Sequence, residues 1–286
     1  MGQQRIKLAA FDLDDTLLLP EGTLSERARA AIEKAADLGM EIVLASGRSF
    51  SSLPAELLGM PQIHYAITSN GAAVNEVPSG KRILARCLSP ESIRVILKLA
   101  REEELVLEAF VEGIPYAWET YLQNPESYGC PSWSVPYVKR TRRPCNDMEE
   151  FLRLHEGELD SVDLICRSQE QRLRYRSILE ARTGELYMTT SVPHLLELSA
   201  AGGGKGSGLA WLCGRLGISR EETAACGNGD NDADMLLYAA IGGAVANASE
   251  VCRKAADILL PSNGEEGAAV FLERLMEENG KGKESL

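Results

Sequence analysis

A short apolar run near the N-terminus, residues 6–11, ends abruptly in a segment with three carboxylates and one hydroxyl, residues 12–16. The run has strand length, and in an open α/β sheet ligands bind at the carboxyl ends of the strands. Asp12 and Asp14 are two residues apart, so both face one ligand only if the chain bends away directly after the strand. Such a cluster suits Mg²⁺, and it also suits a carboxylate nucleophile beside a proton shuttle. A helix N-cap or a solvated turn is the simpler alternative.

Two further apolar runs repeat this arrangement. Residues 42–45 end in the polar segment 46–48, and residues 65–67 end in the polar segment 68–71. Between the first two runs, a capping box at residues 23–26 opens a predicted helix, which apolar residues at helical spacing continue. Strands that alternate with helices form parallel sheets, so the pattern predicts an α/β domain with these polar ends along one edge.

From about residue 82 the alternation of single strands and helices is replaced by a different order of predicted elements. A helix is predicted over 90–104, strands over 105–110 and 114–118, and an irregular aromatic stretch over 119–147. Further helices and strands follow as far as residue 198. We therefore expect an α+β unit inserted into the α/β domain, whose own pattern returns after the glycines at 202–204.

The C-terminal part contains a second acidic strand end. Lys205 opens a predicted helix, and residues 223–226 form a predicted strand that ends in Gly-Asn-Gly-Asp-Asn-Asp at 227–232. Strands over 244–246 and 258–260 and a helix over 266–278 complete the α/β pattern. The acidic loop is expected at the same sheet edge as Asp12.

The composition indicates a soluble globular protein and restricts its partners. The chain has 286 residues, of which 44% are apolar and 25% charged, and its net charge is −12. An acidic chain disfavours nucleic acid and anionic membranes, and no apolar run approaches the roughly 20 residues that span a bilayer. The seven cysteines form no CxxC pair. With no signal peptide expected before the first strand, we expect a reducing, cytoplasmic location.

Four clusters together resemble, in order and spacing, the four motifs of the haloacid dehalogenase (HAD) superfamily. They are "FDLDDTLL" at 11–18, "LASGR" at 44–48, Lys205 and "GNGDNDADML" at 227–236. The chain is most similar to the Cof-type phosphatases with a C2-type cap, as "ITSNGA" at 67–72, "VANAS" at 245–249 and "AADILLPSNGEEG" at 255–267 also indicate. The resemblance implies an α/β fold with a Rossmann-like parallel-sheet core over 1–83 and 192–286. The α+β cap, which would select the substrate, is expected over 84–191.

The resemblance also implies the catalytic roles. Asp12 would be the nucleophile that forms an aspartyl-phosphate. Asp14 would protonate the leaving oxygen and then deprotonate the hydrolytic water, and its backbone carbonyl would bind Mg²⁺. The predicted metal set is Asp12, Asp14, Asn228 and Asp232, with Asp232 either a ligand or a support for the ligands. The predicted phosphate-binding set is Leu13, Ser46, Gly47, Lys205 and Asn231.

The fourth motif departs from the family pattern, Gly-Asp-x-x-Asn-Asp. Gly227, Asn231 and Asp232 match, but Asn228 stands where the family has an aspartate that binds Mg²⁺ directly. An amide carbonyl is still an oxygen ligand, but it carries no charge. Three hypotheses remain: Asn228 binds Mg²⁺ more weakly, Asp230 or Asp232 replaces it, or catalysis is impaired.

The function that these motifs predict is a Mg²⁺-dependent phosphatase of small phosphorylated metabolites. Three alternatives use the same residues. A phosphotransferase or mutase would pass the phosphoryl group to a sugar hydroxyl, a non-catalytic protein would only bind a phosphorylated ligand, and a receiver-like domain would remain phosphorylated on Asp12.

Several other residues receive simpler interpretations. The three histidines, His64, His155 and His194, lie away from the motifs and are expected to be structural. The basic run at 139–143 is interpreted as a solvated loop in preference to an anion-binding site. Asn70 is expected either near the phosphate or in a turn with the following glycine.

Overall fold

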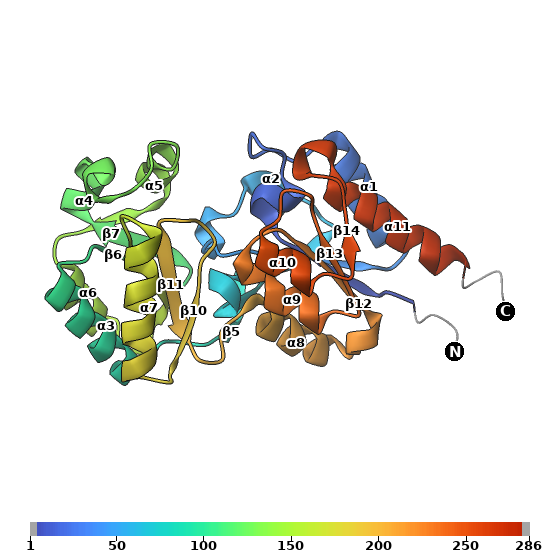
Figure 1. Ribbon diagram of the computed structural model, residues 1–286. Coiled ribbons are helices and arrows are strands. Elements are labelled where there is room, and N and C mark those ends of the chain that lie inside the picture. Colours follow the sequence, from blue (N-terminus) through green and yellow to red (C-terminus); the bar gives the residue numbers. More distant parts are fainter. Residues whose placement is uncertain (1–4, 282–286) are drawn as a thin grey trace. The chain divides into compact units, whose positions relative to one another are not determined.

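The computed structural model describes residues 5–281 and contains two compact units (Figure 1). The core unit comprises the chain up to Gly47, Leu53–Ile83 and the chain from Gly204 onward. The cap unit comprises Arg48–Ser52 and Leu84–Gly203. The predicted α/β core with an inserted α+β unit is confirmed.

The core unit is built on one eight-stranded sheet. In sheet order the strands are β14 (Ile258–Leu259), β13 (Ile241–Ala244), β12 (Thr223–Gly227), β1 (Leu8–Phe11), β2 (Glu41–Ala45), β3 (Ile63–Thr68), β4 (Ala73–Glu76) and β5 (Lys81–Ala85). The pairs from β14 to β3 are parallel, and β4 returns antiparallel to β3. Because β1 lies beside both β2 and β12, the residues that follow these three strands meet at one edge.

Helices cover the core sheet in two groups. The helices are α1 (Glu26–Asp37), α2 (Ala55–Leu58), α8 (Lys205–Leu216), α9 (Ala233–Tyr238), α10 (Glu250–Ala255) and α11 (Gly267–Lys281). The first and last of the long helices, α1 and α11, pack together, whereas α9 packs against α8 and α10 (Figure 1). Phe11 of β1 and Phe271 of α11 meet edge to face at 6.4 Å between ring centroids. Both rings are buried, so they join the central strand to its helical layer.

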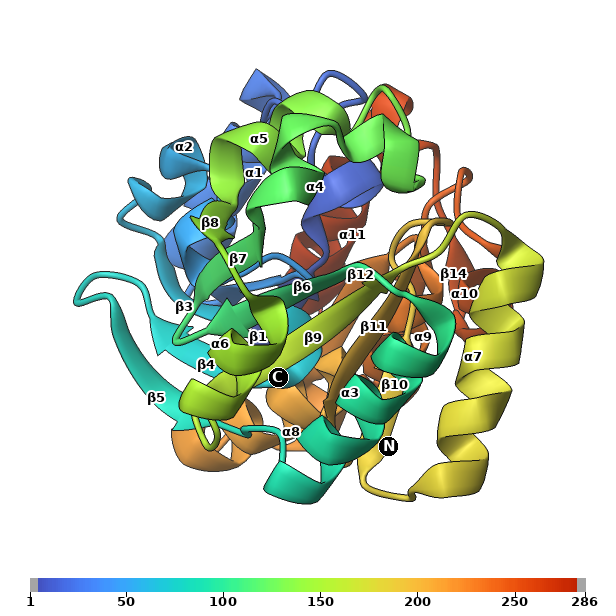
Figure 2. The same ribbon diagram turned by 90° about the vertical axis from the view of Figure 1, so that its left-hand side faces the viewer.

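The cap unit has a six-stranded sheet of its own. Its order is β10 (Leu186–Thr189), β11 (Leu195–Ala200), β9 (Leu159–Ile165), β6 (Leu107–Val111), β7 (Ile114–Trp118) and β8 (Arg143–Cys145). Neighbouring strands are antiparallel except β7 and β8. The helices are α3 (Pro90–Glu103), α4 (Glu119–Gln123), α5 (Val135–Thr141), α6 (Met148–Leu154) and α7 (Gln169–Arg182). In Figure 2, α3, α6 and α7 lie on the same side of this sheet.

The second domain boundary differs from the prediction. We expected the core to resume at residue 192, but the core unit resumes at Gly204. The reason is the pairing of β11, which hydrogen-bonds to β9 and β10 in the cap sheet. An alternating strand pattern carries no information about which sheet the strand joins.

Three local predictions also need correction. The strand predicted at 244–246 is β13 at Ile241–Ala244, because its two glycines lower the strand propensity that the sequence shows. The stretch 119–147, expected to be irregular, contains α4, α5 and β8. The basic run is not wholly solvated: Arg142 is buried and donates to Glu108 Oε2 from Nε at 2.8 Å and from Nη2 at 2.6 Å.

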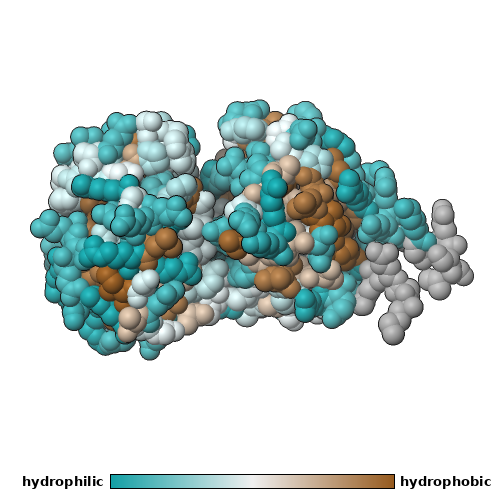
Figure 3. Space-filling model, viewed as in Figure 1, coloured by the Kyte–Doolittle hydropathy of each residue, from teal (hydrophilic) through white to brown (hydrophobic). Residues whose placement is uncertain are grey.

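Exposed apolar side chains are scattered on the core unit. Leu237 of α9, Val251 of α10 and Leu259 of the edge strand β14 are exposed, and Figure 3 shows brown, hydrophobic patches on the face of the core unit that it presents. Isolated exposed apolar residues are common on protein surfaces and indicate no partner by themselves. Within residues 5–281, no helix is both long and apolar enough to cross a membrane.

The three histidines occupy structural positions. His64 and His155 contact the carboxylates of Glu41 and Glu158. His194 is buried in the cap, with its ring edge to face with Trp133 at 5.9 Å. Burial, and secondarily the charge of Arg142, lowers the pKa of His194 to about 4.

The depressed pKa of His194 predicts a loss of stability in mild acid. Below pH 6.5, the ordinary pKa, the His194 side chain binds a proton in the unfolded chain. In the folded chain it binds this proton only below about pH 4. The free energy of unfolding should therefore fall, as pH decreases through this window, by about 1.4 kcal/mol per pH unit from this residue. Urea denaturation of the wild type and of His194→Gln at several pH values measures this contribution of His194 to the free energy of unfolding. If the free energy of unfolding changed with pH equally steeply in the two proteins, the prediction would be wrong.

Candidate active site

The site begins where β1 ends. Asp12 continues the strand by one residue, and its backbone N–H donates to Cys226 O of β12 at 2.9 Å. The chain then bends away over Leu13–Leu17, and Asp15 adopts a positive φ of 57°. Asp12 is buried and Asp14 is exposed. The sharp bend that the spacing of these two carboxylates required is therefore present.

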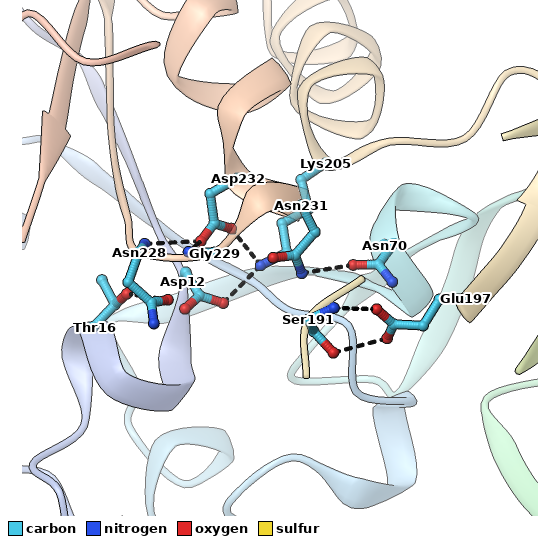
Figure 4. A network of polar contacts seen from close by, with 10 residues as sticks. All are labelled: Asp12, Thr16, Asn70, Ser191, Glu197, Lys205, Asn228, Gly229, Asn231 and Asp232. Carbon is cyan, nitrogen blue, oxygen red and sulfur yellow. Dashed lines mark hydrogen bonds and ion pairs between the residues drawn. The ribbon is translucent and has the colours of Figure 1, made fainter. Parts of the chain in front are cut away.

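Lys205 is the buried cation of the site. Its side chain has no exposed surface, and Nζ lies 2.6 Å from Asp12 Oδ1 and 2.5 Å from Asp232 Oδ1 (Figure 4). The turn after β3 approaches the start of α8 closely, since a Cβ on Gly71 would lie 1.9 Å from Gly204 O. Only glycine at this position leaves room for the turn and for the helix that begins with Lys205.

The two carboxylates carry more charge than Lys205 neutralises. Burial, and then the charge of Asp232, raises the pKa of Asp12 to about 7, even though Lys205 acts in the opposite direction. Burial alone would lower the pKa of Lys205, but Asp12 and Asp232 together raise it above its ordinary range. The site is therefore electronegative around Asp12, which favours a bound cation.

The fourth motif is held by Asp232. Its Oδ2 accepts from the backbone N–H of Asn228 at 2.9 Å and of Gly229 at 2.8 Å, while Oδ1 contacts Lys205. Both oxygens of Asp232 thus have partners within the protein, and the carboxylate has no exposed surface. This arrangement suits a residue that orients the loop and Lys205.

Asn228 faces the first loop. Its side chain is half-buried, and its Oδ1 accepts from Thr16 Oγ1 at 3.0 Å (Figure 4). A carbonyl oxygen keeps a second lone pair, so Asn228 can accept this hydrogen bond and still offer an oxygen to a cation.

The residues present fit a hard cation such as Mg²⁺. Asp12, Asp14 and Asn228 come from the ends of β1 and β12, which are neighbouring parallel strands. They offer carboxylate and amide oxygens, the ligands that Mg²⁺ takes, with water completing the coordination. The surplus negative charge around Asp12 agrees with this donor set.

The segments that follow β2 and β3 are joined by backbone hydrogen bonds. Ser46 is buried, its N–H donates to Ile67 O at 2.9 Å, and its carbonyl accepts from Asn70 N at 3.2 Å. Gly47 follows at a half-buried position. Asn70 lies in a left-handed turn with φ of 50°, so its expected turn role is present.

Asn231 is buried against Asn70. Its Nδ2 donates to Asn70 Oδ1 at 2.9 Å, and the backbone carbonyl of Asn70 accepts from Gly204 N at 2.7 Å. These contacts connect the loop after β12, the turn after β3 and the start of α8. Asn231 is therefore placed to hold the elements around Lys205, and its role toward phosphate stays a prediction.

Two asparagines that the motifs did not single out hold the first loop. Asn247 Nδ2 donates to Asp15 O at 2.8 Å, and Asn263 Nδ2 donates to Leu18 O at 3.0 Å. The two are also joined, because Asn263 N donates to Asn247 Oδ1 at 3.0 Å. Both lie in segments that already resembled the family, but their partners are more than 200 residues away. Residue spacing contains no signal for such a contact.

Comparisons with known proteins agree with this geometry. A sequence profile described as haloacid dehalogenase-like hydrolase matches residues 9–272. The chain is 25% identical to the 5-amino-6-(5-phospho-D-ribitylamino)uracil phosphatase YwtE of Bacillus subtilis, over 95% of this chain and 98% of that protein. It is 26% identical to the HMP-PP phosphatase of Cronobacter sakazakii, over 85% of each chain. A solved haloacid dehalogenase-like hydrolase from B. subtilis matches with a TM-score of 0.82 and 26% identity, over 94% of this chain and 99% of that one.

Proposed function

The chain belongs to the family of haloacid dehalogenase-like hydrolases and is a phosphoric monoester hydrolase of the Cof type, and we propose that it uses Mg²⁺ and an aspartyl-phosphate intermediate to hydrolyse small phosphorylated metabolites. One observation carries this proposal. A buried lysine joins Asp12 to Asp232 at the ends of two neighbouring strands, and Asp14 follows Asp12 by two residues. The names of the two relatives described above support a phosphorylated metabolite as the substrate.

The first half-reaction breaks the phosphate ester. A carboxylate oxygen of Asp12 attacks phosphorus, and the bond from phosphorus to the leaving oxygen breaks. Asp14 donates its proton to that oxygen, so the product leaves as an alcohol. Lys205 reduces the repulsion between the attacking carboxylate and the phosphate dianion, which is strong in a buried site.

The second half-reaction restores the enzyme. Asp14, now ionised, takes a proton from water, and the resulting hydroxide attacks the phosphoryl group on Asp12. The bond between phosphorus and the Asp12 oxygen breaks, which releases inorganic phosphate and the free carboxylate. Ser46, Gly47 and the backbone at Leu13 are the groups we assign to the phosphate oxygens.

When bound, Mg²⁺ would supply positive charge that polarises the phosphate and offsets the charge of the attacking carboxylate. We assign Asp12, the backbone carbonyl of Asp14 and Asn228 as its protein ligands. Asp232 is assigned to Lys205 and to the loop backbone, since both of its oxygens already have partners there.

Phosphate release from phenyl phosphate, with Mg²⁺ and then with a chelator, tests the proposal. Metal-dependent turnover supports it. Transfer to an added sugar hydroxyl in place of water would favour the phosphotransferase alternative, which product analysis detects. No turnover together with tight phosphate binding would favour the non-catalytic binder, and a stable phosphorylated form would favour the receiver-like domain.

Asn228→Asp is expected to strengthen Mg²⁺ binding. The added carboxylate brings a full negative charge to a ligand position, and ligand charge is a main determinant of divalent-cation affinity. We expect the Mg²⁺ dissociation constant to fall by about tenfold, which corresponds to about 1.4 kcal/mol. Titration calorimetry measures it without turnover. An unchanged constant would show that Asn228 is not a ligand, and a loss of affinity in Asp230→Asn would assign the ligand to Asp230 instead.

A further inference from the structure

The turn after β3 has a strained backbone. Ser69, Asn70 and Gly71 follow one another with positive φ angles of 48°, 50° and 82°, and all three are buried. Glycine adopts this left-handed conformation freely, whereas serine and asparagine adopt it at a cost in free energy. Such strain persists only where surrounding contacts maintain it, and it is concentrated at functional sites. The contacts of this turn therefore indicate what the strained conformation achieves.

In this conformation Asn70 contacts three segments of the core unit. Its backbone N–H donates to Ser46 O at 3.2 Å, and its backbone carbonyl accepts from Gly204 N at 2.7 Å. Its side-chain Oδ1 accepts from Asn231 Nδ2 at 2.9 Å. These three partners lie after β2, before α8 and after β12. One residue therefore connects three segments that are far apart in the chain and that carry candidate site residues.

Helix α8 packs on this turn without intervening side chains. A Cβ atom on Gly208 would lie only 3.3 Å from Gly71 Cα. The same helix also approaches the start of α9, because a Cβ atom on Gly206 would lie 2.4 Å from Asp234 O. The first turn of α8, which begins with Lys205, is thus in close contact with two backbone segments. No flexible side chain separates them, so a shift of either segment is transmitted to Lys205.

The side chain of Asn70 joins these two segments to each other. Asp232, just before α9, lies 2.5 Å from Lys205 Nζ, and Asn231 precedes it in the same loop. The hydrogen bond from Asn231 to Asn70 links this loop to the turn after β3 (Figure 4). The turn, the loop and α8 therefore each contact the other two. Together they fix the position of Lys205 Nζ, which lies 2.6 Å from Asp12 Oδ1.

A turn role alone does not explain the asparagine. The two backbone hydrogen bonds of Asn70 are available to any residue in the left-handed conformation, which glycine adopts more easily. Only the contact with Asn231 uses the side-chain amide. Asn70 and Asn231 are 4% and 3% exposed, and a buried polar group that loses its partner is destabilised. The amide of Asn70 is therefore the part of the residue that points to a role beyond the turn.

We propose that Asn70 is a positioning residue for phosphoryl transfer. Its side chain holds Asn231 and the loop of Asp232 against the turn, and this contact keeps Lys205 oriented toward Asp12. Asn70 thus acts through Asn231 and Lys205, and makes no contact with the phosphate. This inference rests on the proposed phosphatase function and adds a residue to its machinery.

Asn70→Gly in the full-length protein tests the inference, with phenyl phosphate as substrate in the presence of Mg²⁺. Glycine keeps the left-handed backbone and its two hydrogen bonds but removes the amide. We expect kcat to fall about tenfold or more and KM to stay within about twofold. The reason is that a misplaced charge beside the reacting atoms affects the transition state more than the bound substrate. A kcat equal to that of the wild type would overturn the inference.

Asn75→Ala is the matched control for a loss of stability. Asn75 of β4 is also buried, and its Nδ2 donates to Thr68 Oγ1 at 2.9 Å. Its removal therefore deletes one buried amide hydrogen bond beside the same strand, without a contact to the loop of Asp232. The melting temperature should fall, while kcat and KM stay within about twofold of the wild type. If Asn75→Ala lowered kcat as much as Asn70→Gly, a general loss of stability would explain both and the inference would be wrong.

A double-mutant cycle with Asn231→Ala separates positioning from direct binding of phosphate. Asn231→Ala removes the same hydrogen bond from its other side. If Asn70 acts through Asn231, adding Asn70→Gly to Asn231→Ala should change kcat by less than about twofold. A further tenfold loss in the double variant would show that Asn70 acts independently of Asn231, and would contradict the inference.

Failure of the inference can be distinguished from failure of the proposed function. A wild type that releases phosphate from phenyl phosphate, with the same kcat in Asn70→Gly, contradicts the inference alone. A wild type that releases no phosphate contradicts the proposed function, and the inference with it.

Discussion

Asp12→Asn is expected to abolish phosphate release from every substrate. An amide cannot attack phosphorus as a carboxylate does, and loss of a nucleophile in enzymes that form a covalent intermediate lowers kcat by roughly 10⁴-fold or more. The substitution keeps the shape of the side chain. It also removes one of the two carboxylates at Lys205, so the lysine still has Asp232 as a partner. The expected result is a folded protein that still binds substrate without turnover.

Asp15→Asn is the matched control for this prediction. It removes the same charge three residues away, at an exposed side chain whose backbone carbonyl, held by Asn247, is unchanged. Steady-state phosphate release should stay within about threefold of the wild type, since no reacting atom is lost. Mass spectrometry of acid-quenched protein provides an independent measurement, with a phosphorylated chain expected for the wild type and none for Asp12→Asn. Turnover by Asp12→Asn at a wild-type rate would exclude Asp12 as the nucleophile.

Lys205→Met is expected to damage both stability and catalysis. The methionine fills much of the same volume, but Asp12 and Asp232 lose the cation that they share. Removing one partner of a buried ion pair costs about 3–5 kcal/mol in the free energy of unfolding. Loss of a preorganised charge at the reacting group should lower kcat by a further ~10²–10³ in the protein that remains folded.

The instability of Lys205→Met should depend on pH. Burial and Asp232 already raise the pKa of Asp12 to about 7, and the loss of Lys205 raises it further. A folded-state pKa above the unfolded value means that the folded protein binds the proton more tightly. The deficit in stability is therefore smaller in mild acid and grows as pH rises through the Asp12 pKa. Urea denaturation in the presence of chelator measures the deficit on both sides of that pKa.

Lys254→Met is the control for the lysine. Lys254 is exposed and pairs with Glu250 one turn earlier on α10. Exposed pairs of this kind contribute about 0.5 kcal/mol or less, so neither stability nor turnover should change measurably. If Lys205→Met were as stable and as active as Lys254→Met, the central role of the buried lysine would be refuted.

The candidate site could be predicted from sequence where its chemistry is local. A strand is recognised from a short apolar run, and the residues just after it are confined to one edge of a parallel sheet. That rule brings Asp12, Ser46, Asn228 and Asp232 to the same edge without any knowledge of packing. The same rule could not assign Asn247 and Asn263, because their partners are backbone carbonyls, which every residue has.

The local sequence pattern predicted the burial of some side chains incorrectly. The run that contains Arg142 predicted a solvated loop, yet Arg142 is buried because Glu108 lies within hydrogen-bonding distance on a strand more than 30 residues earlier. Strand residues such as Asp163 alternate with apolar neighbours, a pattern typical of a sheet with one face in water. Only the packed cap shows that Asp163 is buried.

The sequence by itself therefore determined the α/β class, the alternation of strands and helices through much of the core, the inserted cap and the residues at the strand ends. These follow from periodicity and from the family's motifs, which are local in the chain. The tertiary structure decided that β11 belongs to the cap, that Lys205 joins Asp12 to Asp232, and that Arg142 is buried beside Glu108. Each of these is a pairing between distant segments. Its free energy depends on which groups meet and on how much water they lose, and residue spacing contains neither quantity.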